Sequence, residues 1–327
     1  MFAFTNKFWM GKLAMINKLL VTRYEGNPIL TKQDVPYSVE TVHNAGATKF
    51  NGQYILLFRS HLRNGRSILG IARSDDGYKF RADPKPFMVP SSEIDFAVHE
   101  EYGIEDPRVC SIAGEHYITY SAYSRYGVRI GLAKTRDFKT VERLSLISQA
   151  DMRNVVIFPD TFNSRYARLD RPHSEINPWC IWLSWSPDLI HWGDSVPVIQ
   201  PVQYHWDEMK IGPGATPIRT AQGWLNIYHG VFPTMDGAVY RLGVALHDLA
   251  DPAKVLGVAD DWILSPEDPW ELTGYVHNVV FTCGAIAEDD GTVKIYWGGA
   301  DSVMCVGVAN IEELVDSCLT NARSAIQ

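Results

Sequence analysis

The sequence lacks the features that mark membrane proteins, zinc proteins and disulfide-rich secreted domains. Its 327 residues contain no run of 18 apolar residues, which is about the length that a membrane-spanning helix needs. The five cysteines are far apart, with no Cys-x-x-Cys pair and no spacing that suits zinc. An odd number of cysteines in a chain of this size is typical of buried, reduced thiols. We therefore expect a cytoplasmic protein with no membrane partner, no metal and no cofactor.

The sequence also lacks an excess of basic residues. The formal net charge is -8, which disfavours a nucleic-acid partner. The first residues, "MFAFTNKFWMGKLAMINKLL", are mildly similar to a signal peptide, but three lysines interrupt the apolar segment. We expect residues 1–26 to form an amphipathic extension, for which a helix is one option. It would pack on the body of the protein or on a second subunit of a homo-oligomer, with a retained anchor as the alternative.

An internal repeat organises the rest of the chain. A strand similar to Gly-x-Ala and followed by a polar turn recurs in five segments, at residues 69–80, 130–141, 181–192, 242–255 and 306–315, with Ser184 in the place of the alanine in the third. A strand that starts with an aromatic residue precedes each of them, at Tyr54, Tyr117, Tyr166, Trp224 and Tyr296, and another strand and turn precede that aromatic. A fourth short apolar element recurs at residues 27–30, 85–88, 143–147, 196–199 and 261–264. The repeat unit is therefore four short strands.

Five such units predict an all-β fold, and specifically a five-bladed β-propeller over residues 27–315. The last unit has no fourth strand after it, whereas residues 27–30 have no unit before them. We expect this N-terminal strand to close the last blade. Helices should be short and few, with the best candidate near the chain end, and residues 316–327 should form a C-terminal tail. A β-sandwich or a two-domain all-β protein is the alternative.

The repeat also aligns ionisable residues. Five residues after each aromatic lie Arg59, Ala122, Arg171, His229 and Asp301. Charges at the ends of buried strands are costly unless they face a polar cavity. The starts of the first strands supply a second set, Asn44, Asp106, Arg153 with Asn154, Lys210 and Asn278. We expect the two sets to line one central funnel.

Each of these residues has an ordinary structural alternative. Asp106 precedes a proline and could simply start a turn. Arg171 could pair with Asp170 on the surface, Lys210 could be a solvated charge, and His229 could be a core histidine with satisfied hydrogen bonds. Their shared position in different repeats favours a site over these separate explanations.

The chemistry of the two sets points to phosphate. Cleavage of a glycosidic bond normally needs two carboxyl groups. Here Asp106 faces several basic side chains, and Arg, Lys and a charged His suit phosphate oxygens. Phosphate bound there could attack the sugar in place of a second enzyme carboxylate, held near the anomeric carbon by the basic cluster. The residues therefore predict inverting phosphorolysis, with inorganic phosphate as co-substrate.

Several motifs resemble the mannoside phosphorylases of glycoside hydrolase family 130. They are "HNAGATKFNGQYILLFR", "EDPRV", "RNVVIFP", "RLDRP", "KIGPGATPI", "GWLNIYHG" and "YWGGAD". The resemblance implies a five-bladed propeller with Asp106 as the general acid, whose proton travels through a sugar hydroxyl. It further implies that phosphate is bound by Arg153, Asn154, Arg171, Lys210 and His229. The mannosyl unit would be held by Asn44, Arg59 and Asp301, with Tyr240 a weaker match near the same pocket.

The resemblance implies that a β-mannoside and phosphate give α-mannose 1-phosphate and a released acceptor sugar. The pattern "GPGATPIRT…GWLNIYHGV" looks closer to the mannosylglucose phosphorylase branch. The linkage stays open between β-1,4 to glucose, to N-acetylglucosamine or within manno-oligosaccharides, and β-1,2 in mannobiose or longer oligosaccharides. A β-mannosidase that uses water is the second enzyme hypothesis. A sugar-binding propeller without catalysis is less compatible with five repeats whose inner residues differ.

Overall fold

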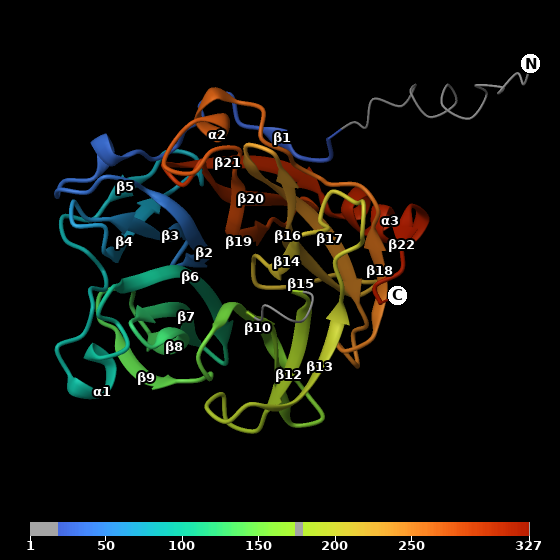
Figure 1. Ribbon diagram of the computed structural model, residues 1–327, viewed down its shortest axis with the longest axis horizontal. Coiled ribbons are helices and arrows are strands. Elements are labelled where there is room, and N and C mark those ends of the chain that lie inside the picture. The colour runs from blue at the N-terminus through green and yellow to red at the C-terminus, as the bar shows by residue number, and fades with distance from the viewer. Residues whose placement is uncertain (1–18, 174–178, 327) are drawn as a thin grey trace, which may run out of the picture.

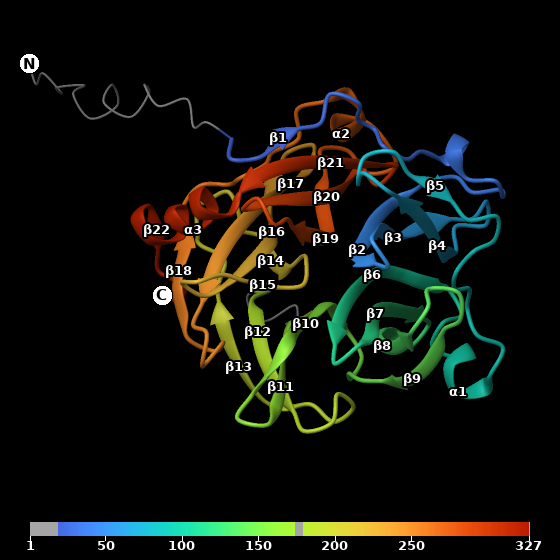
Figure 2. The same ribbon diagram turned by 180° about the vertical axis from the view of Figure 1, so that it is seen from behind.

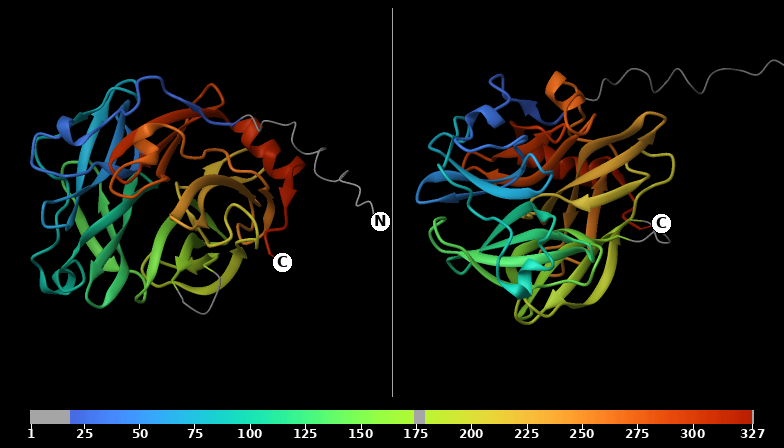
Figure 3. Two further views of the ribbon diagram at one scale, coloured as in Figure 1. Left: turned by 45° about the horizontal axis from the view of Figure 1, so that its top comes forward. Right: turned by 60° about the vertical axis from the view of Figure 1, so that its left-hand side comes forward.

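The computed structural model describes residues 19–173 and 179–326, and this part of the chain is all-β, as predicted. Its strands form five antiparallel meanders, which Figure 1 shows arranged around a common centre. Figure 2 shows the same arrangement from behind, and Figure 3 shows it from two further directions. Residues 1–18, which include most of the predicted extension, lie outside the described residues.

Each meander contains three main strands and a short outer one. The first two are β2 (His43–Phe50), β3 (Gln53–His61), β4 (Ser67–Ser74) and β5 (Arg81–Ala82), then β6 (Gly103–Ile112), β7 (Glu115–Ser124), β8 (Gly127–Thr135) and β9 (Glu142–Leu146). The third is β10 (Met152–Phe162), β11 (Arg165–Pro172), β12 (Ile181–Ser186) and β13 (Gly193–Ile199). The fourth is β14 (Lys210–Pro213), β16 (Trp224–Thr234), β17 (Gly237–His247) and β18 (Val255–Ala259), with β15 (Ile218–Arg219) beside β16. The fifth is β19 (Val280–Ala287), β20 (Thr292–Gly299), β21 (Val303–Asn310) and β1 (Thr22–Arg23).

The first strands of the meanders lie next to one another around the centre. β19 contacts β2, β2 contacts β6, β6 contacts β10, and β10 contacts β14. The circle closes where β16, the neighbour of β14, contacts β19. Side chains at the starts of these strands, and at the ends of the second strands paired with them, therefore meet at one place, which the repeat had indicated.

The N-terminal strand does close the last meander, but earlier in the chain than residues 27–30. Thr22 pairs with Val308 and Arg23 with Gly307, whereas Leu30 forms a single bridge to Met304. The segments 85–88 and 261–264 behave like residues 27–30, since each contributes one isolated bridge and the outer strand lies elsewhere, in β5 or β18. The apolar residue at the end of each of these segments marks a buried contact, and it does not mark a strand.

The chain end is helical where predicted. α3 (Ile311–Thr320) is capped by the preceding Asn310, whose side chain accepts a hydrogen bond from the backbone N–H of Glu313. After α3 the chain adds β22 (Ala322–Arg323) to the outer edge of β18. The sheets therefore include residues on both sides of the predicted limits, 27 and 315. The remaining helical elements are single turns, η1 (Lys32–Asp34), α1 (Ile94–Ala97) and α2 (Pro269–Leu272).

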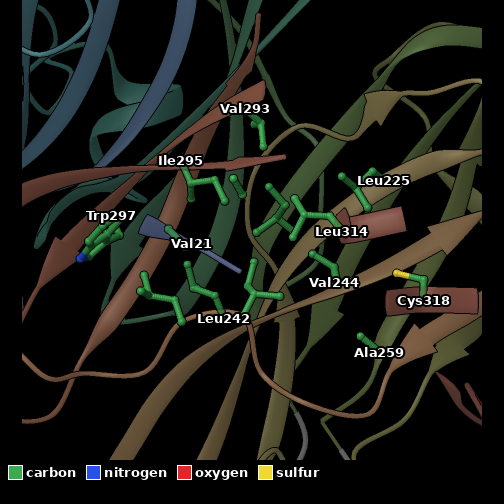
Figure 4. Close-up of a cluster of buried hydrophobic side chains, with 14 of the residues drawn as sticks. Val21, Leu225, Leu242, Val244, Ala259, Val293, Ile295, Trp297, Leu314 and Cys318 are labelled. Atoms are coloured by element: carbon green, nitrogen blue, oxygen red, sulfur yellow. The ribbon is translucent and has the colours of Figure 1, made fainter. Parts of the chain in front are cut away.

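The two ends of the chain share one apolar core. Val21 packs with Leu242 and Trp297, and the same cluster includes Leu314 and Cys318 of α3 (Figure 4). All five cysteines are buried and form no disulfide. In residues 19–173 and 179–326, no helix is both long and apolar enough to cross a bilayer.

Candidate active site

A cavity of about 360 Å³ lies where the first strands meet, and all ten predicted site residues line it. These are Asn44, Arg59, Asp106, Arg153, Asn154, Arg171, Lys210, His229, Tyr240 and Asp301. Ala122, the one apolar member of its set, is absent from the lining, and so is Asn278. Five further residues line the cavity that sequence reasoning had missed, His173, Trp179, Val276, Val279 and Phe281.

A repeated backbone irregularity places three of these residues. Asn44, Asp106 and Asn154 have φ of 50°, 49° and 57°, and each lies at a break in the pairing of its strand with the next. A bulge of this kind re-aims a side chain, and Asn and Asp adopt the left-handed region with less strain than most residues. The same bulge occurs at the same position of three meanders, which explains why the three side chains point into one cavity.

The carboxylate of Asp106 lies in a network of donors. Asn44 Nδ2 donates to Asp106 Oδ1 over 3.0 Å, and Arg59 Nη1 donates to the same oxygen over 3.1 Å. Burial alone would raise the pKa of Asp106, but Arg59, Arg108 and the bond from Asn44 outweigh it and hold the pKa well below its usual range. These contacts keep Asp106 ionised.

The second carboxyl group, Asp301, has the opposite behaviour. Burial raises its pKa to about 6; the charge of Arg59 opposes this rise, and the charges of Asp106 and Glu105 add to it. Two nearby carboxyl groups with pKa values on opposite sides of the usual range are a feature of many active sites. Asp301 therefore takes up a proton at a higher pH than Asp106 does.

Basic side chains form the other part of the lining. Arg153 and Arg171 are directly opposite each other on β10 and β11. Burial, with the charges of Arg171 and Arg153, lowers the pKa of Lys210 to about 8. Burial, with Arg153 and Arg108, likewise lowers the pKa of Arg171 to about 10. Lys210 Nζ lies 5.1 Å from the ring centre of Trp179 and 5.2 Å from that of Tyr240, so two aromatic rings flank it.

His229 differs from the expectation that it adds positive charge. It is fully buried, and burial followed by the charges of Arg171, Arg108 and Lys210 lowers its pKa well below the ordinary value. Its imidazole is therefore neutral. Neither ring nitrogen has a hydrogen-bond partner within the described part of the chain, and the same is true of Arg171 Nε. Buried donors without a partner are costly, and an anion in the cavity would satisfy them.

Arg108 is a further residue that the sequence reasoning quoted but did not assign. Its buried guanidinium donates to Gly214 O over 2.8 Å, to Asp106 O over 2.9 Å and to Asn154 Oδ1 over 3.4 Å. It therefore joins β6, β10 and the chain just after β14, and it contacts two residues of the cavity lining, Asp106 and Asn154. The available signal was the arginine within "EDPRV", a motif that the sequence analysis had already singled out.

Glu105 connects the two parts of the site. Its Oε1 accepts from Arg59 Nη2 over 2.8 Å, and its Oε2 lies 3.6 Å from Arg153 Nη1. The residue that precedes Asp106 thus holds one arginine of each predicted set. No group of three or more His, Cys, Asp or Glu side chains suited to a metal ion occurs among the residues described.

Comparison with known proteins identifies the family. The family model for glycoside hydrolase family 130, described as beta-1,4-mannooligosaccharide phosphorylase, matches residues 16–320. The 1,2-beta-oligomannan phosphorylase of Thermoanaerobacter sp. is 34% identical over 89% of this chain and 98% of its own length. The 4-O-beta-D-mannosyl-D-glucose phosphorylase of Bacteroides fragilis is 31% identical over 90% of this chain and 78% of its own.

A solved structure agrees with these relatives. The beta-1,2-mannobiose phosphorylase from Listeria innocua, in complex with beta-1,2-mannobiose, superposes with a TM-score of 0.84 and 31% identity. The match covers 91% of this chain and 99% of that one. The chain therefore belongs to glycoside hydrolase family 130 and is a glycosyl-transferring enzyme of the mannoside phosphorylase type.

Proposed function

We propose that the enzyme cleaves a β-mannoside by inverting phosphorolysis and releases α-mannose 1-phosphate and an acceptor sugar. The observation that carries this proposal is that one cavity holds the carboxyl groups of Asp106 and Asp301 together with a cluster of cationic side chains and donors without a partner. A hydrolase needs its second carboxylate to activate water. Phosphate brings its own negative charge, and its oxygens match the arginine, lysine and imidazole donors of this lining.

The roles divide the cavity between sugar and phosphate. Asn44, Arg59, Asp301 and the flanking Tyr240 hold the mannosyl unit, whereas Arg153, Asn154, Arg171, Lys210 and His229 hold phosphate. Asp106 is the general acid and passes its proton to the leaving oxygen through a sugar hydroxyl. To carry that proton, Asp106 must have a higher pKa in the substrate complex. A phosphate anion near Asp106 would raise that pKa, because a neighbouring negative charge disfavours the ionised carboxylate.

The five meanders, as we interpret them, are the blades of a five-bladed propeller. The contacts between successive first strands and the return of the N-terminal strand to the fifth meander support this interpretation. A radial arrangement gives each blade one inner strand and so one position in the lining. The five positions carry different chemistry, which supports one asymmetric catalytic site over a repeated sugar-binding one.

The family does not by itself determine which mannosidic linkage the enzyme cleaves or which acceptor sugar it releases. The relatives named above act on β-1,2 and β-1,4 mannosides at similar identity to this chain, 34% and 31%. Mannosylglucose is the substrate that the "GPGATPIRT" pattern favours, and we retain it as the prediction. Hydrolysis with water remains the second hypothesis.

The remaining proposals follow from the reaction. Phosphorolysis consumes phosphate and yields a charged sugar that is useful inside the cell, so we place the enzyme in the cytoplasm. It needs neither a metal nor an organic cofactor, and its activity should therefore be unchanged in a chelator. The apolar start of the sequence supports self-association into a homo-oligomer.

The reverse reaction tests the proposal and the acceptor together. α-Mannose 1-phosphate would be incubated with glucose, N-acetylglucosamine, mannose and β-mannobioses, and phosphate release would be followed. We expect release with at least one acceptor, and the linkage of the isolated product identifies the substrate. No release with any acceptor, from an enzyme that cleaves a β-mannoside, would favour hydrolysis.

A further inference from the structure

Arg59 uses almost all of its hydrogen-bonding capacity on protein acceptors. A guanidinium has five N–H donors. Arg59 Nε donates to Ser67 Oγ over 3.0 Å and Nη1 donates to Asp106, while Nη2 donates to Glu105 Oε1 and contacts His61 Nε2 at 2.9 Å. One N–H of Nη1 has no acceptor among the described residues. Because Arg59 lines the cavity, this is the donor left for a bound sugar.

His61 lies behind Arg59, outside the cavity lining, two residues further along β3. Arginine cannot accept a hydrogen bond, so His61 Nε2 must be the acceptor for Arg59 Nη2. The proton of the neutral imidazole then sits on Nδ1, which donates to Thr41 Oγ1 over 3.1 Å. Thr41 Oγ1 also accepts from the backbone N–H of His61 over 3.0 Å. The contacts thus fix both the tautomer and the orientation of the ring.

The surroundings keep this imidazole neutral and shielded. Burial, followed by the positive charge of Arg59, lowers the pKa of His61 to about 4. The ring of Tyr275 packs on His61 with centres 4.6 Å apart, and the ring of His43 lies 5.0 Å away. Asp106, Glu105 and Arg59 are the charged groups nearby, and they are already paired with one another.

We propose that His61 is a positioning residue, which accepts the hydrogen bond that orients the Arg59 guanidinium toward the sugar. This inference rests on the proposed assignment of Arg59 to the mannosyl unit. Without the acceptor, one N–H of a nearly buried guanidinium is left without a partner, and only the bonds to Ser67, Asp106 and Glu105 hold the fork in place. Loss of a hydrogen bond to a charged group corresponds to a rate effect of about 10- to 100-fold.

Two amide variants separate positioning from packing. In His61→Gln the amide reaches the place of Nε2 and can accept from Arg59, whereas in His61→Asn it reaches only the place of Nδ1 and Thr41. We expect H61N to lower kcat/KM for the mannoside by about tenfold or more and H61Q to lower it by about threefold or less. KM for phosphate should be unchanged in both, because the phosphate donors lie on other strands. The substrate would be the better one of 4-O-β-mannosyl-glucose and β-1,2-mannobiose.

The control is His116→Asn. His116 also contacts a hydroxyl through Nδ1, that of Ser111 at 2.7 Å, but it is not part of the cavity lining, so H116N should match the wild type. Equal activity of H61N and wild type, or equal loss in H61N and H61Q, would overturn the inference. A wild type that releases mannose in place of α-mannose 1-phosphate would refute phosphorolysis, and the H61N and H61Q rates of mannoside cleavage would still decide the role of His61.

Discussion

At the scale of single residues, the site depends on side chains whose pKa values differ from their ordinary values, and two carboxyl groups of the lining are shifted in opposite directions. Asp106 is held ionised by Arg59, Arg108 and Asn44, whereas burial raises the pKa of Asp301 to about 6. Lys210 is an unusual lysine because burial, with Arg171 and Arg153, brings its pKa to about 8. These differences arise from the contacts of each group, and they make the roles of the residues separable by mutation and by pH.

Asp106→Asn tests the assignment of the acid. Asn keeps the size of the side chain but carries no transferable proton, so we expect turnover to fall by about 10²–10⁴-fold with the melting temperature near that of the wild type. Asp301→Asn should act mainly on KM for the mannoside, because Asp301 holds the sugar in this account. Steady-state kinetics of both variants check the prediction, and a large kcat loss in D301N with near-normal D106N would exchange the two roles.

The lowered pKa of Lys210 predicts that kcat/KM for phosphate depends on pH. A lysine with a lowered pKa is charged below that pKa, so Lys210 loses its charge as the pH rises through about 8. The value of kcat/KM for phosphate should therefore fall above pH 8. In Lys210→Arg the fall should disappear, because arginine stays protonated in this range. In Lys210→Ala, KM for phosphate should rise more than KM for the mannoside, and a defect only toward the sugar would contradict the assignment.

At the scale of elements, an ion pair between a partly buried arginine and a fully buried carboxylate secures the closing strand. Arg23 of β1 donates to Glu271 of α2 through Nε over 3.2 Å and through Nη2 over 2.8 Å. Glu271 has no solvent exposure and also accepts from Trp297 Nε1 over 2.9 Å. The backbone N–H of Val279, a residue of the cavity wall, donates to Glu271 O over 3.0 Å. The pair therefore ties the closing strand to one wall of the site.

Arg23→Met should destabilise the protein strongly. It leaves the Glu271 carboxylate buried without its cation, and the loss of one partner of a buried pair costs about 3 kcal/mol or more. Arg136→Met is the matched control, because the Arg136 side chain in its pair with Glu115 is 77% exposed and such pairs contribute about 1 kcal/mol or less. Urea unfolding followed by tryptophan fluorescence measures both. Similar midpoints for the two variants would contradict the role given to Arg23.

At the scale of the whole molecule, the cavity is a junction of all five meanders. A ligand that binds there stabilises the native state by about 3 kcal/mol when its concentration is about 100 times its Kd. Inorganic phosphate alone should therefore raise the melting temperature, and Arg171→Met with Lys210→Met should lose most of the rise. An equal rise in the double variant would show that phosphate binds elsewhere.

Much of this architecture could be predicted from the sequence, because the repeat fixes which residues share a position. Counting five residues from the aromatic of each repeat unit placed Arg59, Arg171, His229 and Asp301 in one set, and all four line the cavity. The closing strand was predicted at residues 27–30 because the apolar Leu30 fits the repeat, although it forms only an isolated bridge. The actual strand, at Thr22 and Arg23, is only two residues long and has no recognisable sequence pattern.

Other parts of the site could not be predicted because they do not repeat. Arg108 and Glu105 differ in type from the residues at the same positions of the other units, so a method based on shared chemistry passes over them. Trp179 lies outside the aligned strands, and only the folded structure shows that it forms a β-bridge with Lys210. The neutral state of His229 depends on burial and on cations from separate meanders, none of which the local sequence "IYHG" contains.

The measurement that tests the central claim most directly is the cleavage of a β-mannoside with and without inorganic phosphate. The account predicts that the sugar is released only when phosphate is present, and that the product is α-mannose 1-phosphate, with inversion visible in the proton NMR spectrum. Release of free mannose at the same rate in phosphate-free buffer would contradict it.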